Sequence, residues 1–271
     1  LLKPEMSKLM RTKTIEEFLN IVFDTSIIGS IYENKETEIQ EASPNKENSE
    51  TKTNTCSRYI MKSVFHELPY NRKIKLEGVH LITSDNGNIA KLLAQKIEDH
   101  GGVSLIINED ILASPELLAT KMSEIFQEYS EISSLIHCSP LSRIEMPDKL
   151  DEWKNITQLQ SKSLFQILRL AAMKQQKEVN FPIEKILTVS SFGGYFGRKH
   201  NESHGLPASG GNSGMLKALK KEKPDIEIKI IDFDDFLLES EIAYRIIREL
   251  EFTSEFIEVG YPRGERVIFH P

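Results

Sequence analysis

The sequence predicts an α/β protein with a doubly wound parallel sheet, because short apolar segments alternate with longer amphipathic segments along most of its length. With 39% hydrophobic and 28% charged residues, the chain has enough apolar material to form a core. No repeat period is evident. One large domain with an appendage therefore fits the 271 residues better than two full domains.

The alternation can be followed segment by segment. The first buried strand is predicted at 79–83, and the next helix at 88–100 has Ile89, Leu93 and Ile97 on one face before two glycines end it. Further strands are predicted at 103–107, 133–137, 185–190 and 226–231, and further helices at 159–173, from 214 to 220 and around 242–250. Right-handed crossovers between these strands predict one doubly wound domain.

The N-terminal part differs in composition. Residues 1–26 contain one short helical pattern between Ile15 and Val22, and one helix cannot form a core alone. Residues 27–57 are rich in Glu, Asn, Lys and Thr, which predicts a flexible linker. We therefore expect the globular domain to occupy 58–271 and, since the chain opens without Met, to be cut from a longer protein.

Charge and cysteine content exclude several classes of function. The net charge is -7 and the lysines are scattered among glutamates, so nucleic-acid binding is not expected. No apolar run approaches the roughly 18 to 20 residues of a membrane span, and the N-terminus lacks a signal-peptide pattern. Cys56 and Cys138 are too far apart to suggest a metal knuckle or a disulfide framework. We expect a cytoplasmic protein without membrane partners.

The turn after the first predicted strand, Thr83–Ala90, is where a doubly wound fold would hold a pyrophosphate on glycine amides. The turn has a single glycine, and Asp85 sets a carboxylate where phosphate oxygens would lie. The candidate cofactor contacts in this turn are Thr83, Ser84, Asn86, Gly87 and Ile89. Residues 108–110 are acidic or neutral where a 2′-phosphate would need a base, so NADPH binding should be weak or absent. The alternative is a plain strand-to-helix turn capped by Asn86 or Asn88.

Several segments of the second half of the chain, residues 136–141, 187–197 and 210–219, resemble segments of one known family, the ketoreductase domains of polyketide synthases. Residues 136–141, which include His137, resemble the segment after a Rossmann strand in that family, and 187–197 resemble its serine-bearing strand end, especially in polyunsaturated-fatty-acid synthases. Residues 210–219 match the Gly-Gly-x-x-Gly-Leu-x-Lys-x-Leu helix of the same branch, and the match continues to Val267. The resemblance implies a short-chain dehydrogenase/reductase-type Rossmann domain, with His137 among its cofactor contacts.

The same resemblance extends to the N-terminal helix. Residues 10–18 look like the last helix of an acyl carrier protein, so 1–26 would be the end of such a carrier or an interdomain helix. The phosphopantetheine motif Asp-Ser-Leu is not present. The implied protein is a type I modular polyketide or polyunsaturated-fatty-acid synthase.

In this family the resemblance implies a catalytic lysine, serine and tyrosine, with tyrosine as proton donor. Lys162 and Ser191 match the lysine and the serine. Ser209 stands at the tyrosine position and Ser213 at the asparagine position, and a serine hydroxyl is too short and too weak an acid to replace a phenol. Tyr195 is the nearby phenol, although an aromatic residue after a Gly-Gly pair is more often a packing residue.

Two polar clusters admit a metal in principle. His200 and His204 lie four residues apart, but a surface loop explains them better, since no third ligand follows at suitable spacing. Asp232, Asp234 and Asp235 are explained more simply as caps of a helix beginning near Phe236. We expect no metal.

Three functions remain open. The first is a degenerate, structural ketoreductase-like domain without cofactor, whose partners are neighbouring domains of the same synthase: the acyl carrier protein, a dehydratase or a ketosynthase. The second is an active NADPH-dependent β-ketoacyl reductase with a non-standard proton donor, favoured by Lys162 and Ser191. The third is an unrelated nucleotide-binding module, which leaves the C-terminal resemblance unexplained.

Overall fold

The computed structural model describes residues 60–69, 76–142, 144, 146–175, 180–199, 209–252 and 256–270. These ranges belong to one unit, Arg58–Pro271. The predicted helix at 1–26, the predicted linker at 27–57 and the pair His200 and His204 lie outside the described residues.

An eight-stranded sheet forms the centre of the domain, in the order β1-β8-β7-β6-β5-β4-β2-β3. The strands are β1 (Lys62–Phe65), β2 (Gly78–Thr83), β3 (Gly102–Ile107), β4 (Ile132–His137), β5 (Ile183–Ser190), β6 (Glu227–Phe233), β7 (Glu258–Tyr261) and β8 (Val267–His270). Neighbouring strands from β3 through β7 pair in parallel, whereas β8 pairs antiparallel with β7 and with β1. The predicted doubly wound parallel sheet is confirmed.

The chain reverses its winding direction at β2. It goes from β2 outward to the edge strand β3 and then returns to β4 on the other side of β2. The return passes through α5 (Glu109–Ala113) and α6 (Pro115–Glu128) with no further strand between them. Compared with the dinucleotide-binding order 3-2-1-4-5-6, the outermost strand is therefore missing. The switch point lies between the carboxyl ends of β2 and β4, where ligands bind in open α/β sheets.

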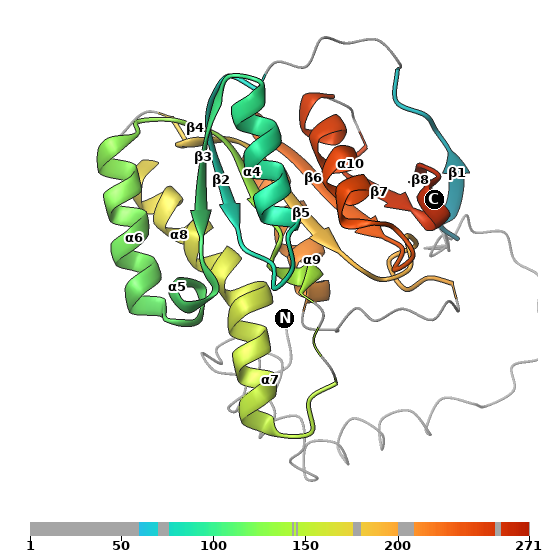
Figure 1. Ribbon diagram of the computed structural model, residues 1–271, viewed down its shortest axis with the longest axis horizontal. Helices are drawn as coiled ribbons and strands as arrows, with labels where there is room; N and C mark the ends of the chain where they lie inside the picture. Colours follow the sequence, from blue (N-terminus) through green and yellow to red (C-terminus); the bar gives the residue numbers. More distant parts are fainter. Residues whose placement is uncertain are drawn as a thin grey trace, which may run out of the picture. The chain divides into compact units, whose positions relative to one another are not determined.

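Helices cover both faces of the sheet (Figure 1). One face carries α4 (Ile89–Asp99) and α10 (Glu239–Glu251), which pack against each other. Their apolar side chains form one core with β2, β4, β5, β6 and β7. The other face carries α6, α8 (Ser163–Gln175) and α9 (Gly210–Glu222), which form a second core. The predicted apolar face of the helix after β2 is confirmed, since Ile89, Leu93 and Ile97 are buried.

The helix predicted at 159–173 belongs to a longer helical run. It consists of α7 (Leu150–Thr157), a π-helical turn η2 (Gln158–Lys162) and α8. A π turn leaves backbone carbonyls without their usual helical partners and is frequent at functional sites. Among the described residues, no helix combines the length and the apolar character that crossing a bilayer requires.

Candidate functional site

The carboxylate of Asp85 occupies the N-terminus of α4. It accepts hydrogen bonds from the backbone N–H groups of Gly87 (3.0 Å), Ile89 (3.3 Å) and Ala90 (2.9 Å). A helix N-terminus presents unpaired N–H groups and a partial positive charge, so an anion is favourable there. Asp85 is buried, and it supplies that anion from within the chain.

The alternative cap by Asn88 is wrong. Asn88 is the residue that flanks α4, but its side chain makes no capping hydrogen bond to the helix. An asparagine amide would satisfy a single N–H group, whereas the two oxygens of Asp85 satisfy three. The charged acceptor therefore takes the position that a neutral cap was expected to fill.

A second carboxylate completes the enclosure of this turn. Glu239, the first residue of α10, accepts a long hydrogen bond from the backbone N–H of Asn88 (3.4 Å) and one from its side-chain amide (3.3 Å). The N–H of Asn86 donates to the hydroxyl of Ser142 (3.1 Å). Every backbone N–H from residue 86 to residue 90 thus has an acceptor inside the protein.

A side chain at position 87 would crowd both carboxylates. A Cβ atom at this position would lie 2.6 Å from Oε1 of Glu239 and 2.7 Å from Oδ2 of Asp85. A glycine in this turn ordinarily lets a pyrophosphate approach the backbone. Here the same absence of a side chain admits two carboxylates.

A pocket of about 270 Å³ opens beside this turn at the carboxyl end of the sheet. Four of its lining residues are acidic, namely Asp85, Asp234, Asp235 and Glu239, and no lysine or arginine lines it. Ser191 lies in the pocket wall and donates a short hydrogen bond to Asp235. A phosphate group entering the pocket would meet like charges.

Thr83 and His137 fasten the ends of β2 and β4 to the π turn. The Nε2 atom of His137 donates to the carbonyl oxygen of Gln160 (2.9 Å), so its Nδ1 atom accepts from the hydroxyl of Thr83 (3.0 Å). That hydroxyl oxygen in turn accepts from the N–H groups of Cys138 (2.9 Å) and Ser139 (3.2 Å). Burial lowers the pKa of His137 to about 4, which keeps the ring neutral. Thr83 and His137, which were both predicted to contact a cofactor, are fully buried, and their side-chain polar atoms are engaged in these hydrogen bonds.

The carbonyl of Gln160 links the π turn to α9 as well. It accepts a second hydrogen bond, from Nδ2 of Asn212 (2.7 Å). Sequence reasoning missed both residues, and it pointed to Ser213, the half-buried neighbour of Asn212. Asn212 is 2% exposed. The only sign of its role in the sequence is that it is a polar residue on a helix expected to pack against the core.

The five predicted catalytic residues come from three segments of the chain: the π turn η2, the loop after β5 and the start of α9. Lys162 is exposed at the end of η2 and makes no hydrogen bond or ion pair within the described ranges. Ser191 lies in the acidic pocket, and Ser209 is buried immediately before α9. Tyr195 is half-buried, with Nζ of Lys199 3.7 Å from its ring centre. Catalytic roles for Lys162, Ser191, Ser209, Ser213 and Tyr195 stay predictions.

Asp232 organises the loop that follows β5. Its carboxylate accepts hydrogen bonds from the hydroxyl of Ser190 (2.6 Å) and from the N–H groups of Phe192 (2.8 Å) and Phe196 (2.7 Å). Phe196 has a φ of 54°, a left-handed conformation that these bonds help to hold. Burial raises the pKa of Asp232 to about 6 despite the donors. The expectation that Asp232 caps the next helix is wrong, because it is engaged with this loop.

The next helix is capped by other means. It begins at Glu239 rather than near Phe236, and its Glu241 side chain accepts from the N–H of Leu238 (3.3 Å), which is the N3 half of a capping box. Asp234 accepts from the N–H groups of Phe236 (2.8 Å) and Arg263 (3.0 Å) instead. In the described part of the chain, no group of three or more His, Cys, Asp or Glu side chains is placed to hold a metal ion.

No family model matches the sequence, and no curated protein matches it. Solved structures do match. An N-terminal ketoreductase from the macrolactin assembly line gives a TM-score of 0.54 at 12% identity, covering 78% of this chain and 43% of that chain. A metagenomic short-chain oxidoreductase in complex with NADP gives 0.53 at 15% identity, covering 69% and 96%. A putative short chain dehydrogenase from Escherichia coli CFT073 gives 0.51 at 14% identity, covering 66% and 93%.

These likenesses define the class of fold. The chain has the Rossmann-like fold of short-chain dehydrogenases and reductases. More particularly, its similarity includes a ketoreductase of an assembly line, which the sequence resemblance had indicated. At these identities the likeness concerns the fold alone.

Proposed function

We propose that this protein is a ketoreductase-like domain of a polyketide or polyunsaturated-fatty-acid synthase that has lost cofactor binding and serves a structural role. The observation that carries the proposal is the occupation of the α4 N-terminus by Asp85 and Glu239. In a reductase of this fold, the pyrophosphate of the cofactor needs those N–H groups.

The size of the expected loss can be estimated. A phosphate charge about 4 Å from one carboxylate is repelled by roughly 4 kcal/mol at an effective dielectric constant of about 20. A difference of that size weakens binding by about 10³, enough to turn micromolar affinity into millimolar. The pyrophosphate would also have to displace Asp85 from three N–H groups.

Catalysis would be impaired independently of cofactor binding. Ser209 stands where the family resemblance places the proton-donating tyrosine, and removing a general acid typically reduces the rate by about 10² to 10⁴. Lys162 is exposed, so the residue matched to the catalytic lysine is in solvent. Both features favour a non-reducing domain.

The proposal includes the surroundings of the domain. A domain without cofactor would act through its packing against neighbouring domains of the same synthase, namely the acyl carrier protein, a dehydratase or a ketosynthase, in the cytoplasm. The fold of the assembly-line ketoreductase is in keeping with this context.

Cofactor titration tests the proposal directly. NADPH and NADH are titrated into the full chain by calorimetry and by nicotinamide fluorescence, beside a cofactor-dependent short-chain reductase as positive control. We expect the control to bind and this chain to show no saturable binding at up to about 1 mM, given the estimated loss. Saturable micromolar binding would refute the proposal.

A second test separates cofactor binding from proton donation. The Ser209→Tyr variant restores the phenol but leaves Asp85 in place, so we expect no NADPH-dependent reduction of a β-ketoacyl thioester. Turnover by this variant would show that the missing phenol alone had silenced the site.

An active NADPH-dependent β-ketoacyl reductase is the second candidate. The position of Ser191 favours it, because this serine lies in a pocket at the switch point of the sheet. This alternative requires another proton donor, such as Tyr195, and predicts turnover by the unmodified chain that is lost in both Ser191→Ala and Tyr195→Phe.

A further inference from the structure

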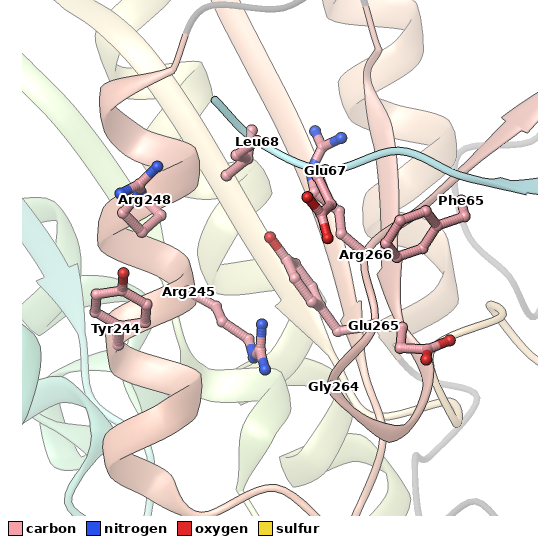
Figure 2. Close-up of a pocket in the computed structure, with 10 residues that line it drawn as sticks. Phe65, Glu67, Leu68, Tyr244, Arg245, Arg248, Gly264, Glu265 and Arg266 are labelled. Atoms are coloured by element: carbon pink, nitrogen blue, oxygen red, sulfur yellow. The ribbon is translucent and has the colours of Figure 1, made fainter. Parts of the chain in front are cut away.

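A different pocket, of about 340 Å³, lies between α10 and the segments around the antiparallel strands β1 and β8. Figure 2 shows Arg245 and Arg248 extending from α10, while Phe65, Glu265 and Arg266 come from the edge of the sheet. This pocket shares no lining residue with the acidic pocket beside the turn after β2.

The guanidinium group of Arg245 is held in place by its neighbours. Its Cζ atom lies 5.0 Å from the centre of the Tyr261 ring, and that ring stacks on Phe233 at 5.3 Å with an interplanar angle of 15°. Gly264 has a φ of +81°, and a Cβ atom there would lie 2.9 Å from Nη2 of Arg245. The glycine thus leaves the room that the guanidinium occupies, and the side chain is preorganised.

Arg245 nevertheless lacks an acceptor. Its Nε atom is buried without a hydrogen-bond partner, and across the described ranges the side chain forms neither a hydrogen bond nor an ion pair. A buried donor left unsatisfied costs about 1 to 3 kcal/mol, and more when the group is charged. A half-buried arginine in this state is a site that an anion would complete.

The surrounding charges do not neutralise Arg245. Glu249, a buried carboxylate on the same helix, is already bonded to Nζ of Lys229 (2.7 Å), to Nε of Arg266 (2.5 Å) and to the hydroxyl of Tyr261 (2.7 Å). One carboxylate therefore serves two cations beneath the pocket. The local charge stays positive.

A second arginine can contribute to the same ligand. Arg248 is one turn further along α10 and donates to the carbonyl oxygen of Pro69 (2.6 Å), a neutral acceptor. Two lining carboxylates, Glu67 and Glu265, are exposed and form no ion pair with either arginine in the described part of the chain. Repulsion from these exposed carboxylates would weaken the binding of a large polyanion more than that of a compact anionic group.

We propose that this pocket binds a ligand through one compact oxyanion, a phosphoryl or a carboxylate group, with Arg245 as the main contact and Arg248 as the second. The exposed aromatic rings of Phe65 and Tyr244 line the same pocket and offer apolar surface to the remainder of such a ligand. This inference does not depend on the function proposed above.

The test uses inorganic phosphate and sodium acetate as separate probes on the full chain, at constant ionic strength. The N–H resonance of the Arg245 side chain is followed by nuclear magnetic resonance, and binding isotherms are taken from its shift. We expect saturable shifts with phosphate, acetate or both. The probe that binds more tightly identifies phosphoryl or carboxylate as the preferred group.

Two variants give the specificity of the effect. Arg245→Gln should weaken binding at least tenfold, followed by backbone resonances around Gly264, whereas Arg169→Gln, which removes an exposed arginine on α8, should leave it unchanged. If Arg245→Gln does not fold, as judged by circular dichroism, Arg248→Gln takes its place with an expected weakening of several-fold. The proposal is overturned if neither probe gives a saturable shift, or if the arginine variants of α10 bind as tightly as wild type.

Discussion

The Asp85→Ala substitution tests whether this carboxylate is a structural part of the domain. The variant loses the acceptor of three N–H groups at the start of α4. Losing a helix N-cap costs about 0.5 to 2 kcal/mol, and losing an anion at the helix dipole costs a further ~0.3 to 1 kcal/mol. The variant also removes one of four neighbouring negative charges in the acidic pocket, which stabilises the fold. Solvent in the pocket screens this repulsion, so the gain is small.

The hydrogen bonds should prevail, because the three donors touch the carboxylate directly. We expect the free energy of unfolding to fall by about 2 kcal/mol. Urea denaturation of wild type and variant measures the difference, with the slope of the transition checked for constancy. Asp110→Ala is the matched control, since Asp110 is an exposed acid in the first turn of α5, and it should change stability by less than ~0.5 kcal/mol.

Unchanged or higher stability in Asp85→Ala would refute this reasoning. It would mean that the carboxylate is held against repulsion from Glu239 and the neighbouring aspartates, and could be displaced by a phosphate without loss. Asp85 would then be no obstacle to a cofactor pyrophosphate, even if the unmodified chain bound NADPH weakly.

Three further predictions concern the same sheet edge. Gly87→Ala should lower the free energy of unfolding by about 1 to 3 kcal/mol, measured by urea denaturation, because its Cβ atom would overlap two carboxylates. His137 has a pKa of about 4 when folded against 6.5 unfolded, so its contribution is present above pH 6.5 and is lost as the pH falls toward 4. Denaturation across this range should show that slope in wild type and not in His137→Gln. Asp232 has a pKa of about 6 against 3.8, so the opposite slope, stability lost as the pH rises from 3.8 through 6, should disappear in Asp232→Asn.

The central strands were predictable because each is a short apolar run bounded by turn residues. The expected strand at 79–83 is β2 (Gly78–Thr83), and the expected strand at 133–137 is β4 (Ile132–His137). The antiparallel edge was missed. There β1 and β8 are four residues each, too short for period-two alternation to be distinguished from loop sequence.

The site was predictable only where the residues involved are close in the sequence. The carboxylate of Asp85 in the phosphate position could be inferred from its place two residues after a strand. Glu239 could not, because it reaches the turn through the packing of α10 against α4, more than a hundred residues along the chain. The same holds for the hydrogen bond between Gln160 and Asn212. It depends on a π turn that no local sequence pattern predicted.

The N-terminus of α4 and the guanidinium of Arg245 differ in whether the described chain supplies an acceptor for them. A short-chain reductase can leave the N-terminus of its first helix open, since a bound cofactor completes it. A domain without cofactor must complete that terminus itself, and Asp85 and Glu239 do so here. Under the function proposed above, the hydrogen bonds that stabilise the start of α4 are the same ones that leave no N–H group there free for a pyrophosphate. Arg245 presents the opposite case, a preorganised cation whose acceptor is missing from the described chain. If this protein binds a phosphoryl or carboxylate group, we expect that group at Arg245 and not at the turn after β2. A phosphate titration that moved the amide resonances of 86–90 and left Arg245 unaffected would reverse that assignment.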